Sequence, residues 1–172
     1  MSWLSDQELE QAIRRFTDRE TLHAFRGIYP RDTLPSGPIR PPVFLILNTD
    51  THNLPGKHWK VIFIDHEYNG EVFDSLALPL SDHVIRFMNI WSRKWSTNTQ
   101  AYQHPFSAQC GIYVLYFILQ RLHVPSMSAL CQLFTSDLLH NERMMHNFDR
   151  YLKYRKFNSQ QKRYPELKRT NQ

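Results

Sequence analysis

Apolar and polar residues follow one another in patterns that predict a helix at the start of the chain, short strands in its middle and further helices after them. From Leu9 to Phe16 the apolar positions recur at helical spacing, and residues 5–8 read Ser-Asp-Gln-Glu, a capping box. The pattern therefore predicts a first helix over residues 6–17.

Three short apolar runs predict a cluster of strands. The run Val43–Leu47 has no polar residue and is typical of a buried strand, and Trp59–Asp65 and Glu71–Asp74 follow as two further strands. Residues 49–57 are polar and include a Pro-Gly pair, which indicates a loop. Residues 27–42 hold five prolines and two glycines, so an extended loop is expected there too.

Helical periodicity returns in the second half of the chain. It predicts helices over residues 81–95, 107–122, 125–137 and 141–154, with a polar loop over 96–104. The helix over 107–122 is apolar almost all round, so it should lie at the centre of the protein. Because the strands cluster between helices, the expected fold class is α+β, with a small central mixed sheet packed by helices.

The length and the cysteine content fit one globular domain. A chain of 172 residues buries roughly 70% of the surface that its unfolded form exposes, so its core needs neither a disulfide nor a metal. The two cysteines, Cys110 and Cys131, make at most one bridge, and a reducing compartment is expected. The N-terminus lacks the pattern of a signal peptide, and the longest apolar run is too short for a bilayer, so no membrane partner is expected.

The net charge of +5 is concentrated at the C-terminus. Residues 1–149 hold 13 Lys/Arg and 15 Asp/Glu, a net charge of −2, whereas residues 150–172 hold 8 Lys/Arg and one acid, a net charge of +7. Such an asymmetry favours contact with nucleic acid or another anionic surface, and a solvated tail is the alternative. We expect a single domain over residues 1–155 and a basic C-terminal tail over 156–172.

The segment Gln103–Gly111 carries the main candidate chemistry, a cysteine at the mouth of the expected central helix. The helix dipole and the free N–H groups would stabilise a Cys110 thiolate. Gln103, seven positions upstream, would donate a side-chain N–H to an oxyanion, and the backbone N–H of Cys110 would be a second donor. Gly111 leaves room for a substrate backbone. The alternative is a buried, inert thiol and a surface amide.

A His-Trp pair stands at the start of an expected strand. The His58 ring would face a cleft there and act as a general base, and Trp59 would shield one side of it. A loop histidine without a catalytic role is the alternative. His52, His58 and His66 are spaced too loosely to resemble a zinc motif, so no metal site is expected.

Asp74 closes an expected strand and would orient the His58 ring by accepting its N–H. The hairpin signal works against this role. Asn69-Gly70 favours a two-residue turn, which would pair residue 65 with residue 74 and place Asp74 far from His58. A triad therefore requires that the chain reverse near His66, or that a bulge shift the register.

The order His-Trp, acid, Gln-x6-Cys-Gly resembles the adenain-like cysteine proteases, which are the adenovirus maturation protease and its relatives in other DNA viruses and virus-like transposons. These enzymes share a fold with the ubiquitin-like-protein proteases, the sentrin and SUMO peptidases. The resemblance covers residues 5–155. The seven-residue step from Gln103 to Cys110 is similar to adenain, whereas the sentrin-type step is shorter by one. The resemblance implies that Cys110 is the nucleophile and His58 the general base and acid. Asp74 would then orient His58, and Gln103 would donate to the oxyanion.

Two departures from adenain concern the orienting acid and the mode of activation. Adenain has a glutamate where this chain has Asp74, and Asp74-Ser75-Leu76 is more similar to the sentrin-type enzymes. No cysteine lies between Asp74 and Cys110, so an activating viral peptide tethered there by a disulfide is not expected. Adenain is stimulated by DNA, and the basic tail is a candidate for phosphate contact and stacking. Four aromatic residues lie among the cations of residues 150–172 and would stack with bases or, as the alternative, pack the last helix: Tyr151, Tyr154, Phe157 and Tyr164.

The resemblance implies a viral or virus-like cysteine endopeptidase that processes virion precursor proteins at small, glycine-containing sites through an acyl-enzyme. Trp59 and Gly111 would form the narrow substrate groove. No cofactor is required for the chemistry, and DNA or a viral peptide would be the activator. A monomer in the virion and the host nucleus is expected. A deubiquitinase or SUMO-type isopeptidase on the same fold is the first alternative, and a non-catalytic DNA-binding packaging protein is the second.

Overall fold

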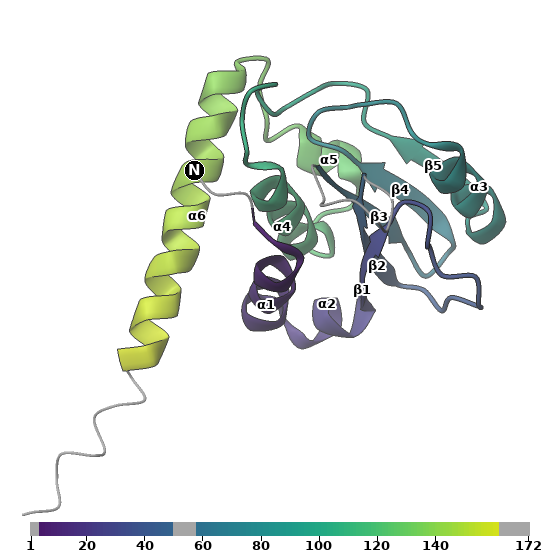
Figure 1. Cartoon of the computed structure of the whole chain (residues 1–172), viewed down its shortest axis with the longest axis horizontal. Coiled ribbons are helices and arrows are strands. Elements are labelled where there is room, and N and C mark those ends of the chain that lie inside the picture. Colours follow the sequence, from purple (N-terminus) through teal and green to yellow (C-terminus); the bar gives the residue numbers. More distant parts are fainter. Residues whose placement is uncertain (1–3, 50–57, 162–172) are drawn as a thin grey trace, which may run out of the picture.

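A computed structural model of the chain describes residues 4–49 and 58–161, with side chains described up to residue 155. The loop expected over 49–57 therefore lies almost entirely outside the described residues. The elements, in chain order (Figure 1), are α1 Asp6–Phe16, α2 Arg19–Ala24, β1 Phe25–Pro30, β2 Val43–Asn48, β3 Trp59–Ile64, β4 Asn69–Phe73, α3 Asp82–Trp91, β5 Lys94–Thr97, α4 Cys110–Arg121, α5 Met127–Cys131 and α6 Leu138–Gln161.

The strands form one mixed sheet in the order β1-β2-β3-β4-β5. The three inner strands pair antiparallel, and each edge strand pairs parallel with its neighbour. Alternate residues of β3 enter two different cores, because successive side chains of a strand point to opposite faces. One core packs against α1, α4, α5 and α6, and the other against α3. The expected α+β fold with a small mixed sheet packed by helices is confirmed.

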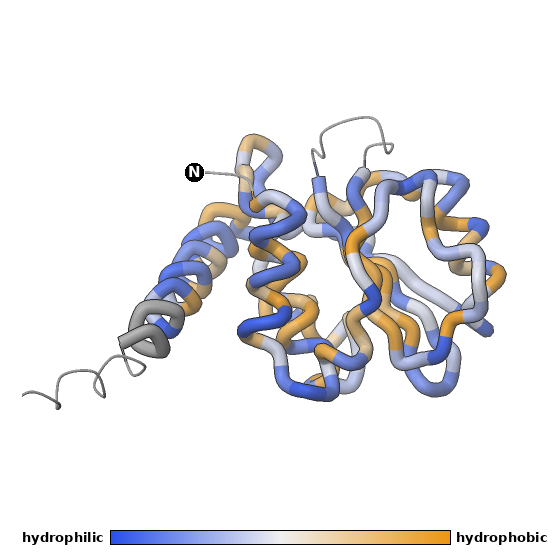
Figure 2. Tube along the Cα trace, turned by 60° about the horizontal axis from the view of Figure 1, so that its bottom comes forward, coloured by the Kyte–Doolittle hydropathy of each residue, from blue (hydrophilic) through white to orange (hydrophobic). Residues whose placement is uncertain are grey.

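Helix α4 lies at the centre of the larger core. Nine of its twelve residues are buried, and α1, α5, α6 and strand β3 all contact it. Figure 2 shows the hydrophobic stretches gathered along the central strands and on the helices that face them. The helix begins at Cys110 and not at residue 107 as predicted, so the cysteine occupies its first turn.

The turn between β3 and β4 differs from the prediction. Asn69-Gly70 does not form the turn but begins β4, and the strand register centres the reversal on Glu67. The chain turns over three residues, with Tyr68 at φ 64° and its N–H bonded to the Asp65 carbonyl. The Asp65 carboxylate accepts the backbone N–H groups of Glu67 and Asn69, which fixes this turn locally. The prediction of a two-residue Asn-Gly turn is therefore wrong.

Gly70 has a packing role instead of a turn role. A Cβ at this position would lie 2.4 Å from Met88 Cε and 2.4 Å from Ser92 Oγ, so only glycine lets the end of α3 approach β4 this closely. The expected helix over 81–95 accordingly ends at Trp91, and β5 follows it along the edge of β4.

Two further elements near the N-terminus were not predicted. Strand β1 overlaps the start of the proline-rich stretch expected as a loop, and its parallel pairing with β2 is a contact between distant residues. Helix α2 precedes it, capped by the Asp18 carboxylate on the N–H of Thr21. Near the C-terminus, α5 is shorter than predicted, whereas α6 is longer.

Helix α6 flanks the rest of the molecule and diverges from it toward its C-terminal end (Figure 1). It continues through residue 155 to Gln161, so the proposed boundary between domain and tail falls inside a helix. The division into domain and basic tail stays a prediction. Among the helices in the described part of the chain, none is both long enough and apolar enough to cross a membrane.

Candidate active site

The reversal around Glu67 brings His58 and Asp74 together. Extending the β3–β4 register by one pair places Asp74 opposite Lys60. Lys60 follows His58 by two residues, so His58, Lys60 and Asp74 point to the same face of the sheet. His58 Nε2 lies 2.5 Å from Asp74 Oδ1, and both residues are buried. The contact that the Asn-Gly turn would have prevented is therefore present.

The Asp74 carboxylate is ionised and fully hydrogen-bonded. Its burial raises its pKa, but the hydrogen bond and charge of His58, followed by the charge and hydrogen bond of Lys60, outweigh burial, and the pKa lies below the ordinary 3.8. Because a carboxylate can only accept, His58 Nε2 must donate to it. The Nδ1 atom is then the ring nitrogen that can take a proton from a thiol.

The turn after Asp74 is held by hydrogen bonds to that residue. Oδ1 also accepts the N–H of Leu76 at 2.8 Å, and Oδ2 accepts the N–H of Leu78 at 2.9 Å. Asn98 binds the Asp74 backbone on both sides, accepting its N–H at 2.9 Å and donating to its carbonyl at 2.7 Å. The orienting acid is therefore fixed by its own loop and by the segment after β5.

Cys110 sits in the first turn of α4, beside the peptide that follows His58. The backbone N–H groups of Trp59, Gly111 and Cys110 interact with its sulfur. Burial nevertheless raises the pKa of the thiol to about 11, and the Asp74 charge adds to this rise, although the three N–H groups lower it. The N–H groups at the helix N-terminus therefore favour the thiolate, as expected, but desolvation outweighs them in this state.

Gln103 connects the Asp74 loop to the nucleophile segment. Its Oε1 accepts from Ser75 Oγ at 2.6 Å, and its Nε2 donates to the Ser107 carbonyl at 2.9 Å. The Ser75 carbonyl in turn accepts the backbone N–H groups of Tyr102 and Gln103. This network fixes the orientation of the amide, with one Nε2 hydrogen committed to Ser107 and the second left for another acceptor.

The two expected substrate-binding residues, Trp59 and Gly111, both contact Leu4. The indole Nε1 donates to the Leu4 carbonyl at 3.3 Å. A Cβ on Gly111 would lie 3.1 Å from Leu4 Cβ and Cδ1, so the leucine packs where a side chain would otherwise stand. The two residues therefore lie together, but the chain before α1 occupies the space against them.

Glu142 on α6 holds the segment between Gln103 and Cys110, and no sequence motif pointed to it. Its carboxylate accepts the His104 backbone N–H at 3.0 Å, Ser107 Oγ at 2.5 Å and Gln109 Nε2 at 2.7 Å. It also accepts the Tyr113 hydroxyl at 3.3 Å. The only signal available was a glutamate on an expected helix 32 residues after Cys110, which gives no indication of this contact.

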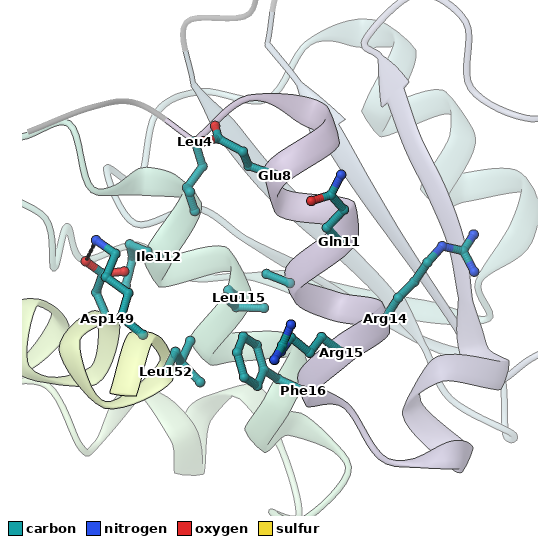
Figure 3. A pocket seen from close by; sticks show the side chains of 12 residues that line it. Leu4, Glu8, Gln11, Arg14, Arg15, Phe16, Ile112, Leu115, Asp149 and Leu152 are labelled. Atoms are coloured by element: carbon teal, nitrogen blue, oxygen red, sulfur yellow. Dashed lines mark hydrogen bonds and ion pairs between the residues drawn. The ribbon is translucent and has the colours of Figure 1, made fainter. Parts of the chain in front are cut away.

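A cavity of about 500 Å³ opens next to the site, between α1, α4 and α6 (Figure 3). Leu4 lines the cavity and also contacts Trp59 and Gly111. Ile112 and Leu115 form its α4 wall. Over the described ranges, no group of three or more His, Cys, Asp or Glu side chains could hold a metal ion.

The five-stranded mixed sheet packed by helices is a fold that a protease also has. The ASFV pS273R protease, in its selenomethionine crystal structure, is similar with a TM-score of 0.58 and 19% identity, over 84% of this chain and 67% of its own. At that identity the likeness shows the fold and no more.

Two other solved structures are similar to a lesser degree. A second crystal structure of ASFV pS273R protease has a TM-score of 0.40 and 29% identity, over 46% of this chain and 33% of its own. The central domain of the uncharacterized Lpg1148 protein from Legionella pneumophila has a TM-score of 0.49 and 14% identity, over 88% of this chain and 98% of its own. No protein-family model matches the sequence, and no curated protein matches it.

Proposed function

We propose that the protein is a cysteine endopeptidase of viral type. The observation that carries the proposal is the buried His58–Asp74 hydrogen bond of 2.5 Å beside the Cys110 thiol at the N-terminus of α4. An orienting acid, a histidine with one free ring nitrogen and a thiol at a helix N-terminus are the parts that thiol acyl transfer needs. The likeness to the ASFV pS273R protease adds a fold in which such chemistry has a precedent.

In the proposed reaction His58 acts as a base during the attack. Because burial raises the pKa of Cys110 to about 11, the resting thiol is protonated at neutral pH. The sulfur attacks the scissile carbonyl carbon while its proton moves to His58 Nδ1, and Asp74 stabilises the imidazolium that results. The carbonyl oxygen becomes an oxyanion.

The oxyanion has three candidate donors. They are the second Nε2 hydrogen of Gln103 and the backbone N–H groups of Cys110 and Trp59, since both of these N–H groups already interact with the sulfur. His58 then gives its proton to the leaving amine as the C–N bond breaks. Water hydrolyses the thioester, which releases the carboxylic acid and returns the proton to the thiol.

The substrate must reach a thiol that is almost completely buried, with 1% of Cys110 exposed. Trp59 and Gly111 are the proposed walls of the groove, so we propose that substrate displaces Leu4 from them. A groove this confined favours small residues, which agrees with cleavage at glycine-containing sites. Virion precursor proteins are the proposed substrates, and the virion and the host nucleus the proposed locations.

Membership of the adenain branch, a monomeric state and activation by DNA or by an untethered viral peptide belong to the same proposal. The basic tail would supply the DNA contact. A deubiquitinase or SUMO-type isopeptidase would have the same catalytic parts. Cleavage of ubiquitin-like fusions compared with capsid precursors distinguishes the two substrate classes.

The test of catalysis is the loss of activity in Cys110→Ala. Peptidase activity on a Gly-Gly peptide amide should vanish in this variant and persist in Cys131→Ser, the matched control for thiol removal. A thiol-directed probe built on the same peptide should label Cys110 alone, as checked by mass spectrometry. Full activity of Cys110→Ala would show that the thiol is not the nucleophile.

A further inference from the structure

Lys60 is a buried lysine whose ammonium group has a hydrogen-bond acceptor for every donor. Its Nζ lies 2.9 Å from Asp74 Oδ2, 3.2 Å from the Leu78 carbonyl and 3.3 Å from the Pro79 carbonyl. An ammonium group has three N–H donors and no acceptor, so these three oxygens satisfy it completely. The residue is 5% exposed, so the contacts lie away from solvent.

The two oxygens of Asp74 bind two different side chains. Oδ1 accepts from His58 and from the N–H of Leu76, whereas Oδ2 accepts from Lys60 and from the N–H of Leu78. With both lone pairs of each oxygen occupied, the carboxylate cannot rotate without breaking hydrogen bonds on both sides. Lys60 therefore fixes which oxygen faces the histidine.

An apolar side chain would be the ordinary choice at this position. Ile62 and Ile64, the next residues of β3 on the same face, belong to the core against α3. Burying an ammonium group is costly, and replacing a buried ion pair with apolar residues is often neutral or stabilising. A charge placed two residues from His58 therefore calls for a role other than stability.

We propose that Lys60 is a positioning residue of the candidate active site, which holds the orienting carboxylate in the rotation that presents Oδ1 to His58. The inference rests on the proposed function. Lys60 shares the Asp74 carboxylate with His58, each side chain bound to a different oxygen. Without Lys60, Oδ2 would lose its charged donor, and the carboxylate could rotate away from the histidine ring.

The titratable and charged groups of this cluster, among the described residues, come from three parts of the fold. From β3 come His58 and Lys60 themselves, from the loop after β4 comes Asp74, and from α4 comes the Cys110 thiol, which senses the Asp74 charge. Arg31 lines the small cavity, of about 120 Å³, that Lys60 also lines. Asp74 is thus the acid through which Lys60 and His58 are linked.

The test removes the charge of Lys60 and follows the hydrogen bond between His58 and Asp74. In Lys60→Met the downfield proton resonance of His58 Nε2–H, assigned with His58→Gln, should shift or broaden because the carboxylate can rotate. The kcat for the peptide should fall at least several-fold with KM unchanged, since the base loses its orientation while the substrate groove is untouched. Lys60→Arg should keep both readouts, and Lys94→Met, which removes an exposed lysine of β5, is the matched control.

The outcomes separate this inference from the proposed function. An unchanged Nε2–H resonance in Lys60→Met, with lower activity or a lower melting temperature, would mean that Lys60 is structural and would overturn the inference. A shifted resonance in a protein that cleaves no peptide would support the inference and refute the peptidase. If Lys60→Met fails to fold, Lys60→Gln, which can still donate to the Leu78 and Pro79 carbonyls, should give the same shift.

Discussion

Replacement of Glu142 by alanine tests whether α6 holds the nucleophile segment in place. The carboxylate accepts four hydrogen bonds, from the His104 backbone, Ser107, Gln109 and Tyr113. Glu142→Ala leaves all four donors without this acceptor. We expect the segment between the oxyanion donor and the nucleophile to lose its fixed conformation before the rest of the fold does.

The magnitude follows from the number and setting of these hydrogen bonds. A donor that loses a charged partner costs about 1–3 kcal/mol when it stays buried. Because Glu142 is partly exposed, water can replace the carboxylate for some donors, and we count only one or two of the four as lost. The expected cost is about 2–4 kcal/mol of unfolding free energy, or a fall in Tm of about 5–15 °C for a chain of this size.

Urea denaturation gives the free energy of unfolding, and labelling with iodoacetamide reports the conformation around Cys110. The matched control is Glu10→Ala, which removes the carboxylate of an exposed pair with Arg14 and should cost less than about 0.5 kcal/mol. Labelling of Cys110 should be at least several-fold faster in Glu142→Ala than in Glu10→Ala. Equal stability and equal labelling in the two variants would refute the reasoning.

Three further predictions concern packing and protonation. Gly70→Ala forces a Cβ to within 2.4 Å of Met88 Cε and should cost about 1–3 kcal/mol in urea denaturation, and a neutral result would mean that α3 is not packed as described. Because burial raises the pKa of Cys110 to about 11, its labelling rate should climb about tenfold per pH unit from 7 to 10, and a plateau below pH 9 would contradict that burial. The lowered pKa of Asp74 stabilises the fold above its ordinary value of 3.8, and this contribution is lost as the pH falls through the folded-state pKa. The difference in unfolding free energy between wild type and Asp74→Asn should therefore shrink as the pH falls below about 4, whereas a constant difference from pH 4 down to pH 2 would argue against the lowered pKa.

Local signals predicted the elements that depend on local chemistry. The capping box at residues 5–8 forms as expected, with Ser5 and Glu8 each bonded to the other's backbone N–H. The continuous apolar run from Val43 became a fully buried strand, and the helix that is apolar all round lies in the core. Each of these depends on residues close together in the chain, which a sequence displays directly.

The remainder depends on contacts between distant residues. Strands β1 and β5 form parallel edges through pairing with β2 and β4, and neither has a periodicity of its own. The hairpin was misjudged because the Asp65 side chain supports a three-residue turn, while Gly70 serves the packing of α3. Lys60 and Glu142 could not be found from a motif, because only packing brings them against Asp74 and the segment before Cys110.

The length of the turn around Glu67 makes the site vulnerable in a way that the site residues do not reveal. Side chains alternate between the faces of a strand, so inserting or deleting one residue here would move Asp74 to the opposite face of the sheet. Such a chain would keep its histidine, its aspartate, its glutamine and its cysteine in the same order. A motif search would still find a protease in it, although the histidine would have lost its acid. Among homologous sequences, the number of residues in this turn would therefore be as informative about activity as the motif itself.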